Sequence, residues 1–304
     1  MIKKLVLFSA LLVLITSAVN AADSTQVGWK KSLIIDVTTT QTGYSDSWVG
    51  GEAGSFNWVS NLNGTAEKQL SPIFDVKSTL KVSFGQTVTQ DEETREWSRP
   101  KKSTDLIDFE NVGRFTLQKF VDPYVAFRVE TQFFDGRKVG YKQYFSPLKL
   151  TESAGIARVL YEKNDDVVSS RFGVALRQIM KSNVDSTEIA PGEFGDYTVV
   201  DSTLTDGGLE WVTDATYQLH ENIKYTGKLT LYKALFFSKS EEVKGTIYED
   251  YWKAVDANWE NIFSAQVTKI ITVNLYTQLL YDKEVSKKGR FKETIAVGFV
   301  FRLI

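Results

Sequence analysis

The chain contains no cysteine, one histidine (His220) and five prolines among 304 residues. Without cysteine, no disulfide framework stabilises a small secreted fold and no lipid can be attached to an amino-terminal cysteine. A single histidine excludes a metal site built from several histidines. Five prolines and 20 glycines are too few for a disordered or fibrous chain, whereas aromatic residues reach 13%. This aromatic content indicates a folded chain in which the rings pack against apolar surfaces.

The sequence also has no excess of positive charge. Its formal net charge is −2, and charged residues make up an ordinary 24% of the chain. A basic surface that attracts phosphate backbones is therefore absent, which argues against nucleic acid as a partner.

The first 21 residues have the features of an export signal. Lys3 and Lys4 give a basic start, an apolar run covers residues 5–15, and small residues follow. A membrane anchor is the alternative, but the apolar run is shorter than the roughly 20 residues that a spanning helix needs. We expect cleavage after residue 21, which changes the formal charge from −2 to −4 by removing two lysines and leaves residues 22–304 as a single domain.

Most of the remaining chain alternates between apolar and polar residues. After Pro72, large apolar residues occupy one face and charged residues such as Asp75, Lys77 and Lys81 occupy the other, which is the pattern of a long two-faced strand. Similar stretches begin after Lys31 and recur at 107–119, 124–134, 167–180, 209–220, 223–237, 251–265, 270–282 and 291–304, with weaker ones at 54–68 and 148–162. The total is twelve.

Strand length and loop length point to a membrane. Soluble strands average about five to six residues, whereas a strand needs roughly nine to eleven to cross a bilayer. The connections alternate between short turns and long loops, as in outer-membrane barrels. The long connections are 43–53, 88–105, 136–147, 181–208, 238–250 and 283–289. The sequence therefore predicts an all-β fold, a transmembrane antiparallel up-and-down β-barrel of about twelve strands with both ends in the periplasm.

The placement of charge fits this barrel. A lysine or arginine on the lipid face costs about 2–4 kcal/mol at the bilayer midplane, so charged residues on the opposite face should line the lumen. These predicted lumen residues are Asp75, Lys77, Lys81, Arg128, Glu130, Arg171, Arg177, Lys224, Lys228 and Arg302. Exceptions to the pattern are Asn111 and Asn261 on the predicted lipid face, and Lys119, Lys233 and Lys253 near strand ends.

The carboxyl-terminal strand carries an apolar row at every second position. Because lipid offers no hydrogen bonds to an open sheet edge, the last strand must pair with the first. The residues predicted to face lipid there are Ile295, Val297, Phe299, Phe301 and Leu303.

In this row the chain resembles the bacterial outer-membrane β-barrel superfamily, whose last strand is recognised by the barrel-assembly machinery. That resemblance implies the cell outer membrane as the location, with outer-membrane lipids and the assembly machinery as partners. The family's last strand usually ends in an aromatic residue, whereas this chain ends in Ile304.

Three segments carry a narrower resemblance: "GWKKSLIIDVTTTQTGYSDSWVGGEAGSFNW", "WSRPKKSTDLIDFENVGRFTLQKF" and "SPLKLTESAGIARVLY". They are similar to an uncharacterised barrel family of gram-negative bacteria. The resemblance implies a fold and no activity.

Three functions remain open. The first is a passive channel or transporter for a small solute, and the alternative is a structural or surface-interaction barrel with a closed lumen, since twelve strands lie between filled small barrels and open porins. The third and weakest is an outer-membrane lipid hydrolase, with His220 as the sole imidazole base. The motif expected around such a histidine is missing, so we expect no enzyme, catalytic residue, metal or cofactor. The segment 181–208 is long enough to plug the lumen.

Overall fold

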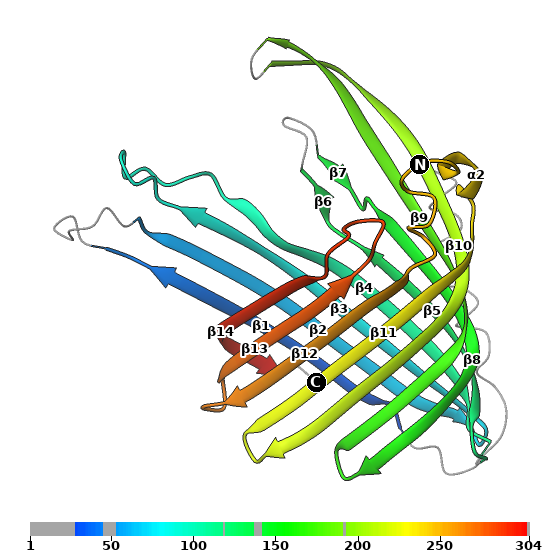
Figure 1. Ribbon diagram of the computed structural model, residues 1–304. Coiled ribbons are helices and arrows are strands. Elements are labelled where there is room, and N and C mark those ends of the chain that lie inside the picture. Colours follow the sequence, from blue (N-terminus) through cyan, green and yellow to red (C-terminus); the bar gives the residue numbers. More distant parts are fainter. Residues whose placement is uncertain (1–27, 45–52, 118, 137–141, 191–192, 303–304) are drawn as a thin grey trace.

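A computed structural model of the protein describes residues 28–44, 53–117, 119–136, 142–190 and 193–302. Twelve strands within these ranges form one closed antiparallel barrel (Figure 1). The barrel strands are β1 (Lys30–Thr42), β2 (Ser55–Ser71), β3 (Phe74–Thr89), β4 (Lys101–Phe115), β5 (Asp122–Thr131), β8 (Leu148–Lys163), β9 (Asp166–Ala190), β10 (Glu193–His220), β11 (Ile223–Phe237), β12 (Val255–Gln266), β13 (Ile271–Tyr281) and β14 (Arg290–Arg302). The predicted all-β barrel is confirmed, including strands at the two weaker stretches.

Nearly every strand pairs with its neighbours in sequence. The exception is that β5 pairs with β8, because β6 (Phe134–Asp135) and β7 (Gln143–Tyr144) form a separate two-stranded sheet in the intervening connection. The barrel closes between β1 and β14, where Ile35 lies opposite Phe301 and Thr39 lies opposite Val297. This pairing satisfies the backbone groups at both edges of the sheet, as a barrel in lipid requires.

Two ends of the barrel can be distinguished by their connections. The tight turns, such as Glu221–Asn222 between β10 and β11, lie at one end, which we call the short-turn end. The opposite end, the long-loop end, carries the long segments, including the one that contains α2 (Ser240–Val243). In the described part of the chain, no helix is long and apolar enough to cross a membrane.

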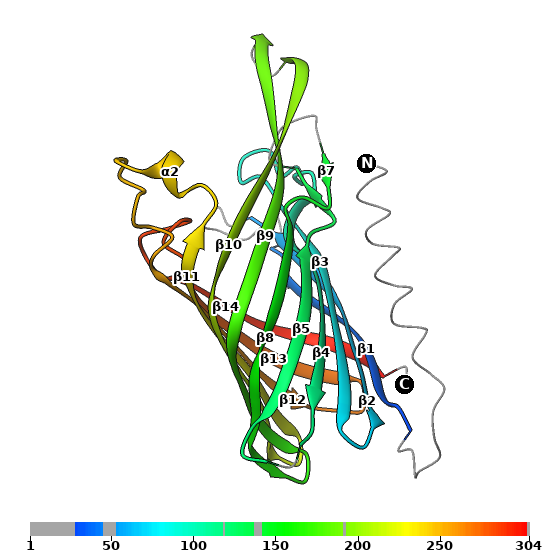
Figure 2. The same cartoon turned by 90° about the vertical axis from the view of Figure 1, so that its right-hand side faces the viewer.

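The expectation of a loop at 181–208 is wrong. β9 and β10 continue as a paired hairpin through this segment, with Met180 opposite Thr203 and Asn183 opposite Val200. The hairpin rises beyond the barrel rim instead of entering the lumen (Figures 1 and 2). Residues with high strand propensity, such as Val199 and Val200, continue in this segment, so the ladder continues after the wall has ended.

Four of the five exceptions noted in the sequence have structural explanations, whereas Lys233 lies within β11. Asn111 donates to the Ser78 hydroxyl at 2.7 Å, and Asn261 accepts from the Tyr225 hydroxyl at 2.8 Å, so these outward polar groups are satisfied. The predicted strand ends were placed too far out in two cases. β4 ends at Phe115, before Lys119, and β12 begins after Lys253.

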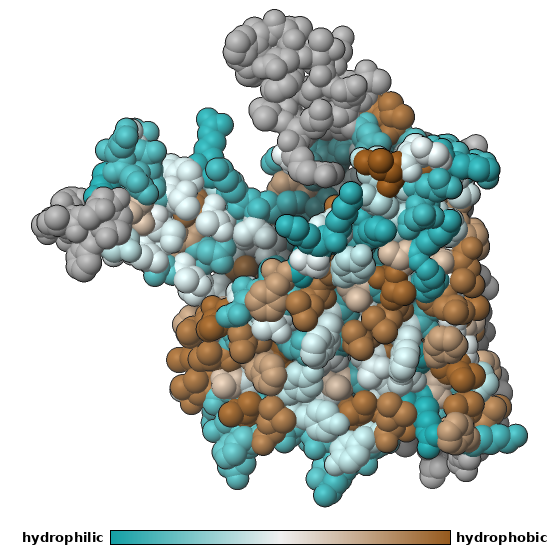
Figure 3. Space-filling view, viewed as in Figure 1, coloured by the Kyte–Doolittle hydropathy of each residue, from teal (hydrophilic) through white to brown (hydrophobic). Residues whose placement is uncertain are grey.

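On the face shown in Figure 3, apolar side chains gather over the barrel wall, between more hydrophilic ends. Rings mark its two borders. At the short-turn end, neighbouring ring centroids in the row Tyr161, Tyr217, Tyr225 and Phe263 lie 4.9 to 6.4 Å apart. At the long-loop end, Phe84 contacts the rings of Trp58, Phe133 and Phe134. Rings at both borders of an apolar band are typical of barrels in a bilayer.

Glycines mark a tight part of the wall between β8 and β11. A Cβ added at Gly173 would lie 2.2 Å from the carbonyl oxygen of Ala154, and one at Gly208 would lie 2.0 Å from that of Lys233. Backbones approach here more closely than any side chain permits.

Candidate functional site

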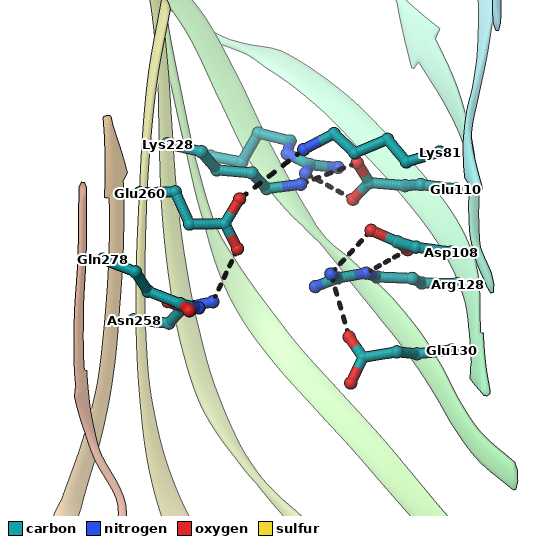
Figure 4. Close-up of polar contacts among 10 residues, drawn as sticks. Lys81, Asp108, Glu110, Arg128, Glu130, Lys228, Asn258, Glu260 and Gln278 are labelled. Atoms are coloured by element: carbon teal, nitrogen blue, oxygen red, sulfur yellow. Dashed lines mark hydrogen bonds and ion pairs between the residues drawn. The ribbon is translucent and has the colours of Figure 1, made fainter. Parts of the chain in front are cut away.

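Inward-facing residues of six strands bring charged groups to one level of the lumen. Cross-strand pairing aligns them, because residues opposite each other share a face of the sheet. The aligned pairs are Lys81 with Asp108, Glu110 with Arg128, and Lys228 with Glu260. With Glu130 and Arg171 they form a set that we call the lumen layer (Figure 4).

Arg128 has the best-satisfied charge of the lumen layer. Its Nε and Nη2 donate to the two carboxylate oxygens of Asp108 at 2.7 and 2.9 Å, and Nη2 also lies 3.0 Å from Glu130. This fork geometry fixes the guanidinium plane against the wall.

Glu110 joins opposite walls of the barrel. Its Oε2 accepts from Lys228 Nζ at 3.0 Å and its Oε1 accepts from Arg171 Nη2 at 2.6 Å. Between β4, which carries Glu110, and β11, which carries Lys228, lie four strands in one direction round the barrel and six in the other. The pair therefore spans almost the full width of the lumen.

A second ion pair crosses the lumen beside the first. Lys81 on β3 lies 3.7 Å from Glu260 on β12, and these strands are also separated by four strands on one side and six on the other. Asn258 donates to Glu260 at 3.0 Å, and Gln278 donates to Asn258 at 2.9 Å, which extends the polar contacts to β13 (Figure 4). Two bridges at one level constrict the lumen.

The lumen layer compensates its own charge. Four cations, Lys81, Arg128, Arg171 and Lys228, face four acids, Asp108, Glu110, Glu130 and Glu260. Its solvent access is uneven: the side chain of Arg171 is 8% exposed, whereas those of Lys81 and Glu130 are each 34% exposed. The layer is closed to solvent around Arg171 and more exposed at Lys81 and Glu130.

A second charged group lies toward the long-loop end. Arg177 Nε donates to Asp206 at 2.8 Å and its Nη1 donates to Asp256 at 3.0 Å, while the guanidinium stacks on the Tyr232 ring. We call these residues, with Asp282 and Glu284 of the β13–β14 connection, the mouth cluster. Burial, and then the nearby acids Asp282, Asp256 and Asp206, raise the pKa of Glu284.

Two connections lie against the wall and each other at this mouth. Trp252, which precedes β12, packs on buried Ala175, Tyr232 and Ala234 of the inner wall. Its neighbour Tyr251 contacts Lys283 and Lys287 of the β13–β14 connection through cation–π interactions. The long connections on this side of the barrel are thus structured at the lumen entrance.

The remaining predicted lumen residues lie nearer the short-turn end or at the chain end. Asp75 lies 3.9 Å from Arg114, and the more exposed Lys77 lies 3.7 Å from Glu67. Lys224 lies opposite Gln218 and Ser264. The backbone of Arg302 lies opposite Ile34, and its side chain falls outside the described part, as does all of Leu303.

The other four residues named on the closing strand face outward. Ile295, Val297, Phe299 and Phe301 are between 48% and 62% exposed. Ala296, between two of them, is buried on the opposite face. The export-signal prediction concerns residues 1–21, which lie outside the described residues.

Most of the acids in these two clusters were not predicted from the sequence. Asp108, Glu110 and Glu260 of the lumen layer were not named, nor were Asp206 and Asp256 of the mouth cluster. The alternation already held the signal in β4, where Asp108 and Glu110 are separated by Phe109. What the sequence lacked was the pairing of strands far apart in the chain.

Little in the structure resembles a catalytic centre. His220 is exposed at the end of β10, and among the described residues no hydrogen bond joins its imidazole to a serine. The described ranges also contain no group of three or more side chains suited to a metal ion.

The closed barrel, its apolar outer band and its charged interior define a β-barrel of the outer-membrane type. A family model described as "Protein of unknown function (DUF3078)" matches residues 39–136, about a third of the chain. A search of curated proteins gave no match.

Solved outer-membrane barrels are similar over nearly their whole length, at low identity. An outer membrane channel from Pseudomonas putida F1 is 10% identical, with 94% of this chain and 97% of that chain covered and a TM-score of 0.40. The NanC porin is 10% identical, with 89% and 100% covered and a TM-score of 0.36. The translocator domain of the autotransporter NalP from Neisseria meningitidis is 8% identical, with 98% and 95% covered and a TM-score of 0.33.

Proposed function

We propose that the protein is an outer-membrane barrel that passes small hydrophilic solutes through a narrow, charge-lined lumen. The observation that carries this proposal is the lumen layer, which is ionic across the whole width of the barrel and yet partly open to water. Neither a dry core nor a wide pore has this combination.

Water in the lumen is favoured by the cost of burying charge. Each ion removed from water costs several kcal/mol even after relaxation, on the order of the stability of a small domain. In the lumen layer, Lys81 and Glu130 each keep about a third of the side chain exposed, and Glu260 keeps 22%. These groups are easier to explain beside a water path than inside a sealed interior.

The cross-lumen bridges limit what passes. A solute must move beside the Glu110–Lys228 and Lys81–Glu260 pairs, which join opposite walls. A twelve-stranded cylinder is already narrower than a sixteen-stranded porin. We therefore expect passage to be limited to small polar solutes.

The membrane placement in this proposal rests on the outer wall. Its apolar side chains lie between a row of rings at the short-turn end, assigned to the periplasm, and the ring cluster around Phe84 at the long-loop end, assigned to the cell exterior. Outer-membrane lipids and the barrel-assembly machinery are the partners that this placement requires, and cleavage after residue 21 would precede insertion.

Conductance in a planar bilayer tests the proposal. Residues 22–304, folded in detergent and added at low concentration, should give discrete current steps that are stable with time. Heat-modifiable migration in gels supplies the control for folding. A folded, inserted barrel that remains electrically silent would contradict solute passage.

A second candidate, a closed barrel with a surface-interaction role, is favoured by one specific contact. Glu110 holds cations from β9 and β11 simultaneously, so the centre of the lumen is already bridged. The β9–β10 hairpin, which projects beyond the rim, would then be the functional part (Figure 2). A silent barrel that retains the fold is the outcome expected for this candidate.

A further inference from the structure

A small groove lies on the outer wall of β8, β9 and β10, away from the lumen. We propose that it binds a glycerophospholipid of the periplasmic leaflet, with the headgroup phosphate at Arg158 and one acyl chain along the groove. The inference rests on the membrane placement proposed above and is independent of conduction. The groove is lined by Val121, Ile156, Ala157, Arg158, Leu160, Ser170, Phe172 and Trp211.

Strand pairing sets the order of residues along the groove. Ile156, Phe172 and Trp211 lie opposite one another in one row across the three strands. Arg158 and Ser170 form the next row toward the short-turn end. A bulge in β8 between Val159 and Tyr161 follows, beside the exposed Leu160. The groove therefore runs from an apolar floor to a single cation.

The floor has no free polar groups. The Trp211 indole N–H donates to the Ser170 hydroxyl at 2.7 Å, and that hydroxyl lies 3.0 Å from the Thr213 hydroxyl. These polar atoms are satisfied among themselves, so the exposed ring faces of Trp211 and Phe172 are available to hydrocarbon. An acyl chain matches this surface.

Arg158 supplies the charge complementarity. Its guanidinium stacks on the ring of Phe120 at 3.9 Å from the centroid, and Phe120 belongs to the β4–β5 turn. The cation is thus held at the short-turn end of the apolar band, which the membrane placement assigns to the periplasmic leaflet. Within the described residues, no carboxylate forms an ion pair with Arg158.

An unpaired cation on the lipid side is costly unless a partner arrives. A lipid phosphate at headgroup depth gives the guanidinium the two-pronged acceptor that it binds best. The guanidinium lies one row from the apolar floor, toward the short-turn end. One ligand with a phosphate and an acyl chain can therefore contact both the cation and the apolar floor. Lipid A also carries phosphates, but it occupies the opposite leaflet and is an outcome of the test.

Native mass spectrometry of the delipidated, folded barrel provides the test, with dioleoyl-phosphatidylglycerol as the probe. Arg158→Gln should weaken binding of the first lipid about tenfold, the change expected from the loss of one charge-assisted hydrogen bond. The matched control is Lys68→Gln, which removes a cation that lies over the Trp29 ring elsewhere on the barrel. The control should bind like the wild type.

Two further arms keep the proposal falsifiable. Arg158→Lys, which keeps the charge and loses the fork, should fall between the wild type and Arg158→Gln, and heat-modifiable migration confirms that each variant is folded. Equal binding by the wild type and Arg158→Gln would overturn the site, as would an Arg158-dependent preference for lipid A. If the barrel conducts but shows no Arg158-dependent lipid binding, only the lipid site is contradicted. If it shows Arg158-dependent lipid binding but does not conduct, only the channel proposal is contradicted.

Discussion

At the scale of single residues, Glu110 is the point on which the lumen layer depends. It is the acid that contacts cations from two other strands, and both contacts are at hydrogen-bond distance. Its side chain and those of Arg171 and Lys228 are each less than a fifth exposed. Removing one member of such a buried set leaves charges without compensation.

Replacing Glu110 with glutamine should therefore have two effects. The free energy of unfolding in urea should fall by about 3–5 kcal/mol, the cost of breaking a buried ion pair. If the channel proposal holds, single-channel conductance should rise, because the bridge between β4 and β11 is lost.

The control for this variant is Glu67→Gln, whose partner Lys77 is more than half exposed. Such a pair contributes less than about 1 kcal/mol, and no change in conductance is expected. Equal stability of the two variants would show that the lumen is wetter than the geometry of Glu110 indicates.

At the scale of the element, successive residues of β14 alternate between the outer face of the barrel and the lumen. Val297 faces outward and is 55% exposed, whereas Val300 lies opposite Asp36 on the inner face. These two valines have the same chemistry and differ in what surrounds them.

Lysine at position 297 should destabilise the barrel by about 2–4 kcal/mol, the cost of a cation on the lipid face near the middle of a bilayer. Lysine at position 300 should be tolerated, because Asp36 lies opposite it. Urea unfolding in lipid vesicles measures both. Comparable losses for the two variants would contradict a lipid-facing outer wall.

The tight wall between β8 and β11 gives a second prediction for an element. Gly173→Ala should destabilise the barrel by more than about 1 kcal/mol, because the added methyl group meets backbone that cannot move independently. Gly64→Ala is the matched control, since its Cβ would lie 3.4 Å from Leu33. Thermal unfolding that affects both variants equally would show that this wall relaxes freely.

How far the sequence predicts an element depends on what ends it. Strands bounded by tight turns were placed well, because a turn such as Glu221–Asn222 interrupts the alternation. The sequence predicts the lower parts of β9 and β10 but not their continuation through 181–208, because residues beyond the barrel wall follow the same strand propensities as those within it. Loop composition alone could not reveal that the two segments continue to pair.

At the scale of the whole molecule, the mouth cluster couples connections that are distant in sequence. Burial and the neighbouring acids raise the pKa of Glu284, so between its ordinary value and the raised one the β13–β14 connection binds more protons in its native position than it would if detached from the mouth. The observed position of this connection therefore loses stability as the pH rises through this window. Asp206, Asp256 and Asp282 repel the ionised group, and Arg177 attracts it.

This pH dependence can be followed with a single spin label, since the chain contains no cysteine of its own. A label at Ser286→Cys should become more mobile as the pH rises above the ordinary glutamate pKa of about 4.3. Glu284→Gln should remove most of this change. Glu241→Gln, which lies on exposed α2, should leave it intact. If the mobility of the label does not change with pH, the raised pKa of Glu284 does not control this connection.

The sequence by itself determined the barrel: the period of two, the length of the strands and the closing row at the carboxyl end. These are local properties, because each strand must present one face to lipid and the other to the lumen wherever it stands in the chain. The tertiary structure decided which charges meet. Glu110 and Lys228 are 118 residues apart and belong to opposite walls, so their contact follows from the circumference and register of the closed sheet, which no single segment encodes.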